Sequence, residues 1–365
     1  MAELAVIPAT NGVSDDRLGA AAVVTLDRGG ALNALTPAMV ARLDGCYRRF
    51  ARDANLYVVI VKSADPKAFC AGGDVRALSA LARSDVAAAR AALRAEYGLN
   101  WLHECFSKPT VVFMDGFVMG SGVGISAYAT HRVAGPRYTF AMPETAIGFF
   151  PDVGTAYGLA RLPHHIGRYL GLTGHSVDRA DAYALGLVTH CLEPEQFAEV
   201  EAGLAEAHPV DPLLDERHRN PGPGPLMVHA EAIEHCFAAA SVEEVLERLE
   251  GVGGGSAGFA QKALADLRTR SPLGLKVSLR HIREAAALDL RQTLEVDYRL
   301  GCRFMEVADF HEGVRAALID KDHAPRWVPV ALADVTKNQL DDLFAAMPSR
   351  ELNLALRQEM QRMRV

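Results

Sequence analysis

The sequence predicts an α/β fold in which a strand-and-helix half precedes a mostly helical half. Up to about residue 153, segments with the composition of strands alternate with segments of helical periodicity. Beyond that point strand-like segments nearly vanish, and helical patterns follow one another. Two apolar runs of strand length, residues 56–62 and 110–114, lack polar alternation, which is typical of strands buried on both faces.

The first half begins with a predicted strand at residues 20–27. Thr36 and Pro37 then predict the start of a helix, because a hydroxyl residue followed by proline suits the first helical positions. The apolar residues that follow Pro37 recur at helical spacing. The other elements predicted in this half are a long Ala- and Arg-rich helix at 84–106 and short strands at 131–134 and 138–140.

The second half is predicted to be helical, with loops where proline or glycine accumulate. Gly186 lies just after one helical pattern, as a terminating residue should. Residues 221–225 and 251–255 are predicted loops, and residues 338–365 form an amphipathic, charged segment. The predicted helices are 155–161, 178–185, 242–250, 259–270, 273–288, 291–307 and 311–319. We therefore divide the chain into a core at 1–190, a helical region at 191–335 and a peripheral C-terminal helix at 336–365.

Composition narrows the class of protein. Half of the 365 residues are hydrophobic and 23% are charged, a balance typical of a globular chain rather than a disordered one. The net charge of −7 argues against a nucleic-acid partner. No apolar run approaches the ~20 residues that span a bilayer, so no membrane partner is expected. Residues 1–19 show neither a secretory nor a transit pattern, which predicts a cytoplasmic location.

Cysteine and histidine spacing gives no sign of a metal site. The six cysteines are scattered without a C-x-x-C pair, so we expect reduced, buried thiols rather than disulfides or zinc ligands. The thirteen histidines show no H-E-x-x-H pattern. We therefore expect no metal.

Two glycine clusters, at residues 69–74 and 115–124, each lie between a predicted strand and a predicted helix. Glycines let the backbone approach a ligand, and free N–H groups at a helix start suit an anion or a polarised carbonyl oxygen. The clusters could converge into a two-donor oxyanion hole, or each could be a tight turn. A dinucleotide fingerprint built on Gly122 and Gly124 with Glu144 is disfavoured, because these glycines do not directly follow a strand.

Glu144 and Asp152 lie in a loop-like stretch rich in proline, glycine and phenylalanine. Apolar neighbours can desolvate such carboxylates and raise their pKa values into the range useful for acid–base chemistry. The alternatives are a solvated Glu144 and an Asp152 that only caps the following helix. The residues alone leave these possibilities open.

Several short motifs, taken together and in their order along the chain, resemble the crotonase (enoyl-CoA hydratase/isomerase) superfamily. The tail is similar to the 3-hydroxyisobutyryl-CoA hydrolase branch, and the resemblance covers roughly residues 20–332. It implies a spiral of β-β-α units that gives two roughly perpendicular sheets, followed by a helical C-terminal region. The motifs that carry it are FCAGGD at 69–74, MGSGVG at 119–124, PE at 143–144, PDVG at 151–154, SPLGLK at 271–276 and DFHEGVRA at 309–316.

The resemblance implies a binding site for an acyl-CoA thioester. Its carbonyl oxygen would be held by the amides of Gly73 and Ser121, where Ser121 departs from the glycine usual in the family. Gly72 and Asp74 lie beside the first donor and would bind substrate. Glu96 matches a substrate-contacting glutamate of the hydrolase branch, although a solvated helix residue is the alternative.

The resemblance also implies the reaction. Glu144 would act as nucleophile or as general base on water, and Asp152 would position the hydroxyl of the acyl group or the water. Hydratases carry a second glutamate at the position of Gly124, so hydration is disfavoured. The implied function is hydrolysis of a short 3-hydroxyacyl-CoA in valine catabolism. The alternatives are a hydratase or isomerase that uses Glu144 alone, and a non-catalytic acyl-CoA-binding protein.

The implied partners follow from this chemistry. Coenzyme A is part of the substrate and its thiolate leaves readily, so no cofactor is expected. Arg28, Lys67 and Lys321 are candidates to hold the phosphates of CoA. The superfamily favours oligomers, and a homo-oligomer, a trimer or a dimer, is expected, although residues 193–258 could block or replace that contact.

Overall fold

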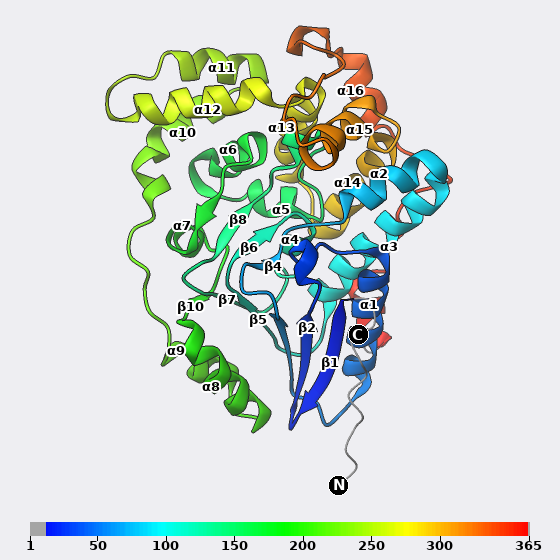
Figure 1. Cartoon of the computed structure of the whole chain (residues 1–365), viewed down its shortest axis with the longest axis vertical. Helices are drawn as coiled ribbons and strands as arrows, with labels where there is room; N and C mark the ends of the chain where they lie inside the picture. Colours follow the sequence, from blue (N-terminus) through cyan, green and yellow to red (C-terminus); the bar gives the residue numbers. More distant parts are fainter. Residues whose placement is uncertain (1–11, 364–365) are drawn as a thin grey trace.

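The computed structural model describes residues 12–363, in which two sheets are surrounded by helices (Figure 1). The larger sheet has the order β1-β2-β3-β5-β7-β10, and the smaller has the order β4-β6-β8-β9. The strands are β1 (Val13–Leu18), β2 (Ala21–Leu26), β3 (Val58–Ser63), β4 (Ala68–Cys70), β5 (Thr110–Met114), β6 (Phe117–Met119), β7 (His131–Ala134), β8 (Thr139–Ala141), β9 (Val177–Asp178) and β10 (His190–Cys191).

From β3 to β8, successive strands alternate between the two sheets, which makes this part of the chain a spiral. β3, β5 and β7 lie side by side and parallel in the larger sheet. β4, β6 and β8 follow them in turn and are parallel neighbours in the smaller sheet. Each turn of the chain therefore adds one strand to each sheet, as the resemblance implied.

The central strands are buried on both faces because each face packs on a different cluster of apolar side chains. In β3, Val59 and Val61 join the main core, whereas Val58 and Ile60 pack with Val200 and other residues of a second cluster. α8 (Pro194–Ala205) and α9 (Val210–Asp215), which the sequence did not predict, cover the strands on this face and complete the second cluster. The predicted strands at 20–27, 56–62 and 110–114 are confirmed as β2, β3 and β5.

Local signals predicted both α1 and the long helix that follows the first glycine cluster. In α1 (Pro37–Arg52), the Thr36 side chain accepts the Met39 N–H, which confirms the predicted start. The helix expected at 84–106 is confirmed as α3 (Val86–Cys105), and α2 (Val75–Ser84), whose bounds were not predicted, precedes it. Asp85 separates them because its carboxylate caps α3 through the Ala88 N–H.

The remaining helices wrap the smaller sheet and the spiral core (Figure 1). The segments predicted near 242–250, 259–270, 273–288 and 291–307 are confirmed to within a few residues, and α6 and α10 were not predicted. The helices in this part are α4 (Ser121–Gly124), α5 (Thr155–Leu159), α6 (Ile166–Thr173), α7 (Arg179–Ala184), α10 (Ala230–Phe237), α11 (Val242–Glu250), α12 (Ala257–Thr269), α13 (Pro272–Ala285), α14 (Leu290–Phe304) and α15 (Ala308–Val314).

The C-terminal segment forms two short helices, α16 (Lys337–Phe344) and α17 (Arg357–Arg362), where the sequence predicted one. The chain between them is tied to α3, because the Trp101 indole donates to the Ala355 carbonyl at 2.8 Å. The main apolar core draws residues from all three predicted parts of the chain. The boundaries at 190 and 335 stay a prediction.

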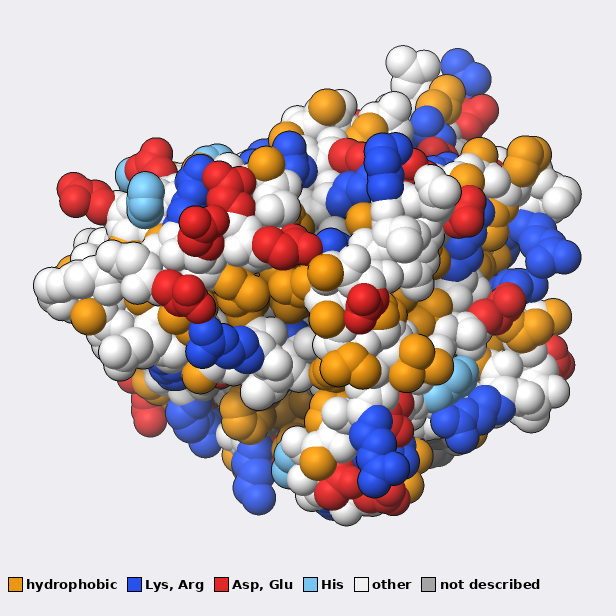
Figure 2. Space-filling model, turned by 90° about the horizontal axis from the view of Figure 1, so that it is seen from above, with side chains coloured by type: hydrophobic (Ala, Val, Ile, Leu, Met, Phe, Trp, Pro, Cys, Tyr) orange, Lys and Arg blue, Asp and Glu red, His pale blue; other side chains and the backbone are white. Residues whose placement is uncertain are grey.

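The surface mixes charges of both signs. Figure 2, seen from above, shows acidic and basic side chains interspersed, with hydrophobic side chains gathered near the middle of this face.

All six cysteines are buried and free, which confirms that part of the sequence prediction. Within residues 12–363, no helix is long and apolar enough to cross a bilayer.

Candidate active site

The two glycine clusters meet at one edge of the smaller sheet. They follow β4 and β6, which are parallel neighbours, so their carboxyl ends lie together. A Cβ at Gly73 would lie 2.9 Å from the Ser121 Oγ, and a Cβ at Gly120 would lie 3.4 Å from the Gly72 Cα. The two clusters are therefore in contact: a side chain at Gly73 would displace the Ser121 hydroxyl, and one at Gly120 would touch the Gly72 backbone.

This approach leaves two amide donors close together. Within residues 12–363, neither the Gly73 N–H nor the Ser121 N–H has a hydrogen-bond acceptor. Gly72, at φ +119°, is fixed because its carbonyl accepts the Leu35 N–H at 2.8 Å. Ser121 is the first residue of α4, where the N–H groups have no acceptor inside the helix. The geometry fits a two-donor oxyanion hole, in which one donor is typically worth ~10²–10³ in rate.

Glu144 places a buried carboxyl against the second cluster. It opens a short 3-10 turn, η2 (Glu144–Ile147), and a Cβ at Gly120 would lie 3.0 Å from its Oε1. The side chain is only 7% exposed, and its Oε2 has no hydrogen-bond partner among the described residues. Burial raises the pKa of Glu144 to about 8. The alternative of a solvated Glu144 is therefore wrong.

Asp152 is the second buried carboxyl of this region, at 9% exposure. The Tyr97 hydroxyl, from α3, donates to its Oδ2 at 2.6 Å. Burial, and then the nearby Glu96 and Glu144, raise the pKa of Asp152 well above its usual range. Its carboxylate does not cap α5, which begins after Gly154 without a side-chain cap.

Glu96 completes a group of three interacting carboxyls. One of its oxygens is fully buried without a partner in the described chain, which contradicts the alternative of a solvated helix residue. Burial raises the pKa of Glu96, and the nearby Ser121 hydroxyl offsets part of this rise. Negative charges that repel one another in an apolar setting disfavour ionisation, and this adds to the effect of burial on the pKa of Asp152.

Sequence reasoning missed Tyr97 and Asn100, which lie on the same helix as Glu96. Asn100 is fully buried, and neither polar atom of its side chain has a hydrogen-bond partner among residues 12–363. Glu96, Asn100 and His103 follow the spacing of one helical face. Three polar residues on a face that should be apolar were the signal that could have identified α3 as part of the site.

Packing leaves no room for a side chain at Gly124, the position where, by the resemblance, hydratases carry a second glutamate. A Cβ at Gly124 would lie 2.8 Å from the Asn100 Nδ2 and 2.8 Å from the Val153 Cβ. A glutamate cannot fit there without moving both neighbours. The site therefore has no second carboxyl at Gly124.

The turn after Asp152 is strained. Val153 has φ +51° and Gly154 has φ +79°, and Val153 is fully buried. A β-branched residue in the left-handed region is a rare conformation that costs of order 1–3 kcal/mol. Such strain persists only where the surroundings enforce it, and it occurs here beside a candidate site residue.

Asp74 and the basic candidates have contacts or exposure of their own. Asp74 caps α2 through the Ala77 N–H and forms an ion pair with Arg28 at 2.8 Å. Lys67 and Lys321 are exposed. Asp74 is thus engaged by its own helix and by Arg28, and the assignments to substrate and phosphates stay predictions.

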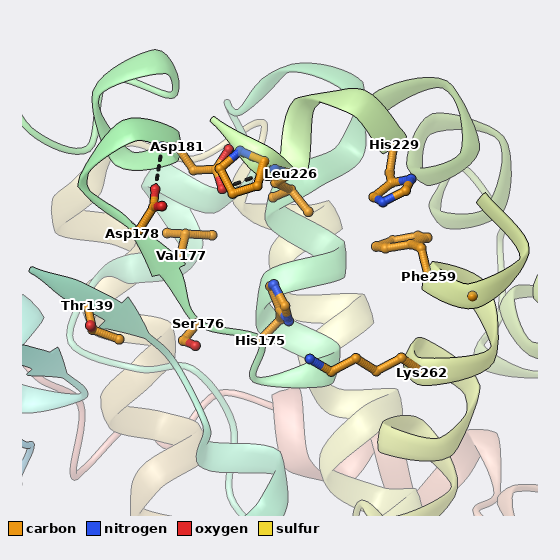
Figure 3. Close-up of a pocket in the computed structure, with 12 residues that line it drawn as sticks. Thr139, His175, Ser176, Val177, Asp178, Asp181, Leu226, His229, Phe259 and Lys262 are labelled. Carbon is orange, nitrogen blue, oxygen red and sulfur yellow. Dashed lines mark hydrogen bonds between the residues drawn. The ribbon is translucent and has the colours of Figure 1, made fainter. Parts of the chain in front are cut away.

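A separate cavity of about 530 Å³ lies between β9 and α12 (Figure 3). His175 and Lys262 point toward each other across it, and the His229 ring stacks on Phe259 with centroids 4.6 Å apart. None of the predicted site residues lines this cavity. Within residues 12–363, no group of three histidine, cysteine or acidic side chains could hold a metal ion.

The helix α15 packs directly against η2, the short turn that begins with Glu144. Gly148 ends η2 at φ +68°, and a Cβ there would lie 2.1 Å from the main-chain oxygen of Asp309 in α15. We expect Gly148→Ala to lower the free energy of unfolding by roughly 2–4 kcal/mol, because it adds a backbone clash to an unfavourable φ.

Gly186→Ala is the matched control for that substitution. Gly186 has a similar φ of +71°, but no atom lies within 4 Å of its Cβ position. We expect Gly186→Ala to lower the free energy of unfolding, measured with urea, by only about 1 kcal/mol. Equal losses for the two variants would contradict the close contact between η2 and α15.

Comparison with known proteins places this geometry in a family. The sequence model described as enoyl-CoA hydratase/isomerase matches residues 21–344. The chain belongs to the enoyl-CoA hydratase/isomerase family. The chain is 39% identical to the mitochondrial 3-hydroxyisobutyryl-CoA hydrolase of Rattus norvegicus, with 92% of this chain and 89% of the relative covered. The human enzyme of the same name is 37% identical over the same shares.

Solved structures of this enoyl-CoA hydratase/isomerase family confirm the predicted fold. One is a carnitinyl-CoA dehydratase from Mycobacterium thermoresistibile, with TM-score 0.89, 34% identity, and 94% of this chain and 99% of that chain covered. Another is an enoyl-CoA hydratase from Rhodobacter sphaeroides 2.4.1, with TM-score 0.87, 35% identity, and 94% and 100% covered. These two names describe hydration chemistry, whereas the curated relatives are hydrolases.

The cytoplasmic location predicted from the sequence is contradicted. The curated relatives are named as mitochondrial enzymes, which points away from the cytoplasm. The prediction depended on residues 1–19, of which 1–11 lie outside the described part of the chain.

Proposed function

We propose that this chain hydrolyses 3-hydroxyisobutyryl-CoA to 3-hydroxyisobutyrate and CoA, a step of valine catabolism. One observation carries the proposal: Glu144 is a buried carboxyl with a free oxygen beside two unengaged amides, while packing closes Gly124 to a second carboxyl. This arrangement supports attack on a thioester carbonyl rather than a two-glutamate addition of water. The names of the curated relatives support the same reaction.

In the proposed reaction the thioester oxygen accepts hydrogen bonds from the Gly73 and Ser121 amides. Ionised Glu144 attacks the carbonyl carbon, or removes a proton from a water that attacks it. The C–S bond then breaks, and CoA leaves as a thiolate that takes up a proton. If Glu144 is the nucleophile, water cleaves the resulting anhydride and restores the carboxylate. The amides stabilise the developing oxyanion in either route.

Asp152 is proposed to hold the 3-hydroxyl of the acyl group. Its raised pKa favours the protonated form, and in that form it can donate a hydrogen bond while it accepts one from Tyr97. This contact selects for a hydroxyl, but it does not distinguish 3-hydroxyisobutyryl-CoA from 3-hydroxypropionyl-CoA. Those substrates differ by one methyl group, which in an apolar pocket is worth only ~1–3 kcal/mol.

A two-substrate assay tests the proposed function. The protein is incubated with 3-hydroxyisobutyryl-CoA and a thiol reagent, and separately with crotonyl-CoA while the absorbance of the double bond is followed. Release of free CoA from the first substrate, without loss of the double bond in the second, is expected. Loss of the double bond without free thiol would favour a hydratase, and tight binding without turnover would favour a non-catalytic binding protein.

The pKa of Glu144 sets the expected pH dependence. Since the carboxyl must be ionised to act, and burial raises its pKa to about 8, kcat/KM should rise about tenfold per pH unit below pH 8. It should level off above that value. Initial rates at subsaturating substrate between pH 6 and 9.5 measure this profile. A profile that is already flat at pH 6 would contradict the raised pKa.

We also propose that the chain forms a homo-oligomer, a dimer or a trimer. Ile319, Val328 and Val330 each expose more than half of an apolar side chain within one short stretch, which supports a covered surface there. Mass photometry should find two or three times the 39.3 kDa of one chain. A single species at 39.3 kDa would contradict the proposal.

A further inference from the structure

The strained turn after Asp152 is held from both sides by side chains far away in the sequence. The peptide group between Val153 and Gly154 has its carbonyl and its N–H in different contacts. The Tyr128 hydroxyl donates to the Val153 oxygen at 2.5 Å. The Gly154 N–H donates to the Asp297 Oδ2 at 2.6 Å. Both polar atoms of one peptide group are therefore fixed by side chains.

Asp297 cannot leave this contact, because its other oxygen is also engaged. The residue is fully buried in α14, and its Oδ1 lies 2.5 Å from the Nε2 of His281 in α13. His281 is also buried, and its ring packs edge-on against Phe150 with centroids 5.9 Å apart. A buried carboxylate is tolerated only where such partners satisfy it.

The turn itself leaves no freedom for an alternative arrangement. A Cβ at Gly154 would lie 2.2 Å from the Tyr128 hydroxyl and 2.7 Å from a Leu290 methyl. On the other side, the main-chain oxygen of Asp152 accepts the Thr155 N–H at 2.9 Å and the Thr155 hydroxyl at 2.7 Å. The backbone that follows the Asp152 side chain is thus fixed at each of its peptide groups as far as Gly154.

We propose that Asp297, held by His281, is a positioning residue that acts with Tyr128. Together they hold the Val153–Gly154 peptide in its left-handed conformation and so direct the Asp152 carboxyl toward Tyr97 and the substrate. Neither residue touches the acyl-CoA. This inference rests on the proposed function, because it assigns the role through Asp152. It also gives α13 and α14 a part in the chemistry, through contacts that cross 143 residues of sequence.

The test compares Tyr128→Phe and Asp297→Asn with a matched control, Asp181→Asn. Asp181 is likewise buried and accepts a backbone N–H from a distant segment, that of Leu226, but it lines the separate cavity. We expect kcat with 3-hydroxyisobutyryl-CoA to fall about 10- to 100-fold in the first two variants, with KM changed less than about threefold. In the control, kcat should stay within about twofold of the wild type.

A double-mutant cycle separates positioning from a general structural role. In an Asp152→Ala background the side chain to be positioned is absent, so Tyr128→Phe or Asp297→Asn should lower kcat less than about threefold further. Full, independent losses in that background would overturn the proposal, as would an unchanged kcat in the single variants. Tyr128→Phe removes one oxygen from a half-buried side chain, so it tests the proposal even if Asp297→Asn does not fold. Absence of turnover by the wild type would instead refute the proposed function.

Discussion

Glu144→Gln should lower kcat for thioester hydrolysis by about 10⁴-fold, the largest effect expected of any substitution in this chain. The amide keeps the size of the carboxyl but can neither attack the carbonyl nor accept a proton from water. Because the change is isosteric, the Kd for substrate should stay within a few-fold. Single-turnover release of CoA measures the rate, and equilibrium binding measures the affinity.

The same substitution should stabilise the protein at alkaline pH. The pKa of Glu144 is raised in the folded chain, so its contribution to stability is present below the unfolded value of about 4.5 and is lost as pH rises through about 8. At pH 9 the free energy of unfolding of Glu144→Gln should exceed that of the wild type by roughly 2–5 kcal/mol, and at pH 5 the two should be similar. Urea unfolding at both values measures this difference.

Glu201→Gln is the control for Glu144→Gln. Glu201 is a partly buried glutamate on α8 that forms an ion pair with Lys62. It should keep full activity and should not gain stability at pH 9. If Glu144→Gln retained hydrolysis within tenfold of the wild type, the assignment of Glu144 would be wrong.

Asp152→Ala should produce the second-largest loss, about 10²- to 10³-fold in kcat for 3-hydroxyisobutyryl-CoA. The substitution removes the group that the Tyr97 hydroxyl orients and that is proposed to hold the hydroxyl of the acyl group. Asp152→Asn should be milder, about tenfold. The reason is that the raised pKa of Asp152 favours its protonated form, which donates a hydrogen bond as an amide also can.

Isobutyryl-CoA, which lacks the hydroxyl, provides the control for Asp152. The wild type should prefer the hydroxylated substrate in kcat/KM, and Asp152→Ala should lose most of this preference. A preference that survives in Asp152→Ala would assign recognition of the hydroxyl to another group. If Asp152→Asn were as damaging as Asp152→Ala, the ionised form would be the working one.

The parts of the fold that the sequence predicted are those with local causes. The continuous apolar run of β3 needs no partner to be recognised, and the cap at Thr36 is a contact over three residues. α3 was predicted at 84–106 from its own Ala- and Arg-rich composition, and the Asp85 cap that starts it is also a contact over three residues. α8 and α9 were not predicted because their apolar faces are short. These faces can be recognised as buried only once they pack against the outer face of β3.

The candidate site divides in the same way. Glu144 and Asp152 are close in sequence, and their loop residues marked them together. Tyr97 contacts Asp152 across 55 residues of sequence, and Asp297 contacts Gly154 across 143. No local pattern predicts contacts between segments so far apart. The pKa values of Glu144 and Asp152 are raised by burial, which arises only when the chain is packed. Their apolar neighbours in the sequence indicated the direction of this effect.

The buried cysteines have a practical consequence for anyone who handles the protein. Burial raises the pKa of Cys70, next to the first glycine cluster, to about 12, and raises those of Cys46 and Cys191 to about 11. Thiols that stay protonated and shielded neither react with alkylating agents nor oxidise readily. The folded protein should therefore give no background with a colorimetric thiol reagent, should survive storage without a reductant, and should become reactive only when it unfolds, so that labelling of cysteine reports its opening.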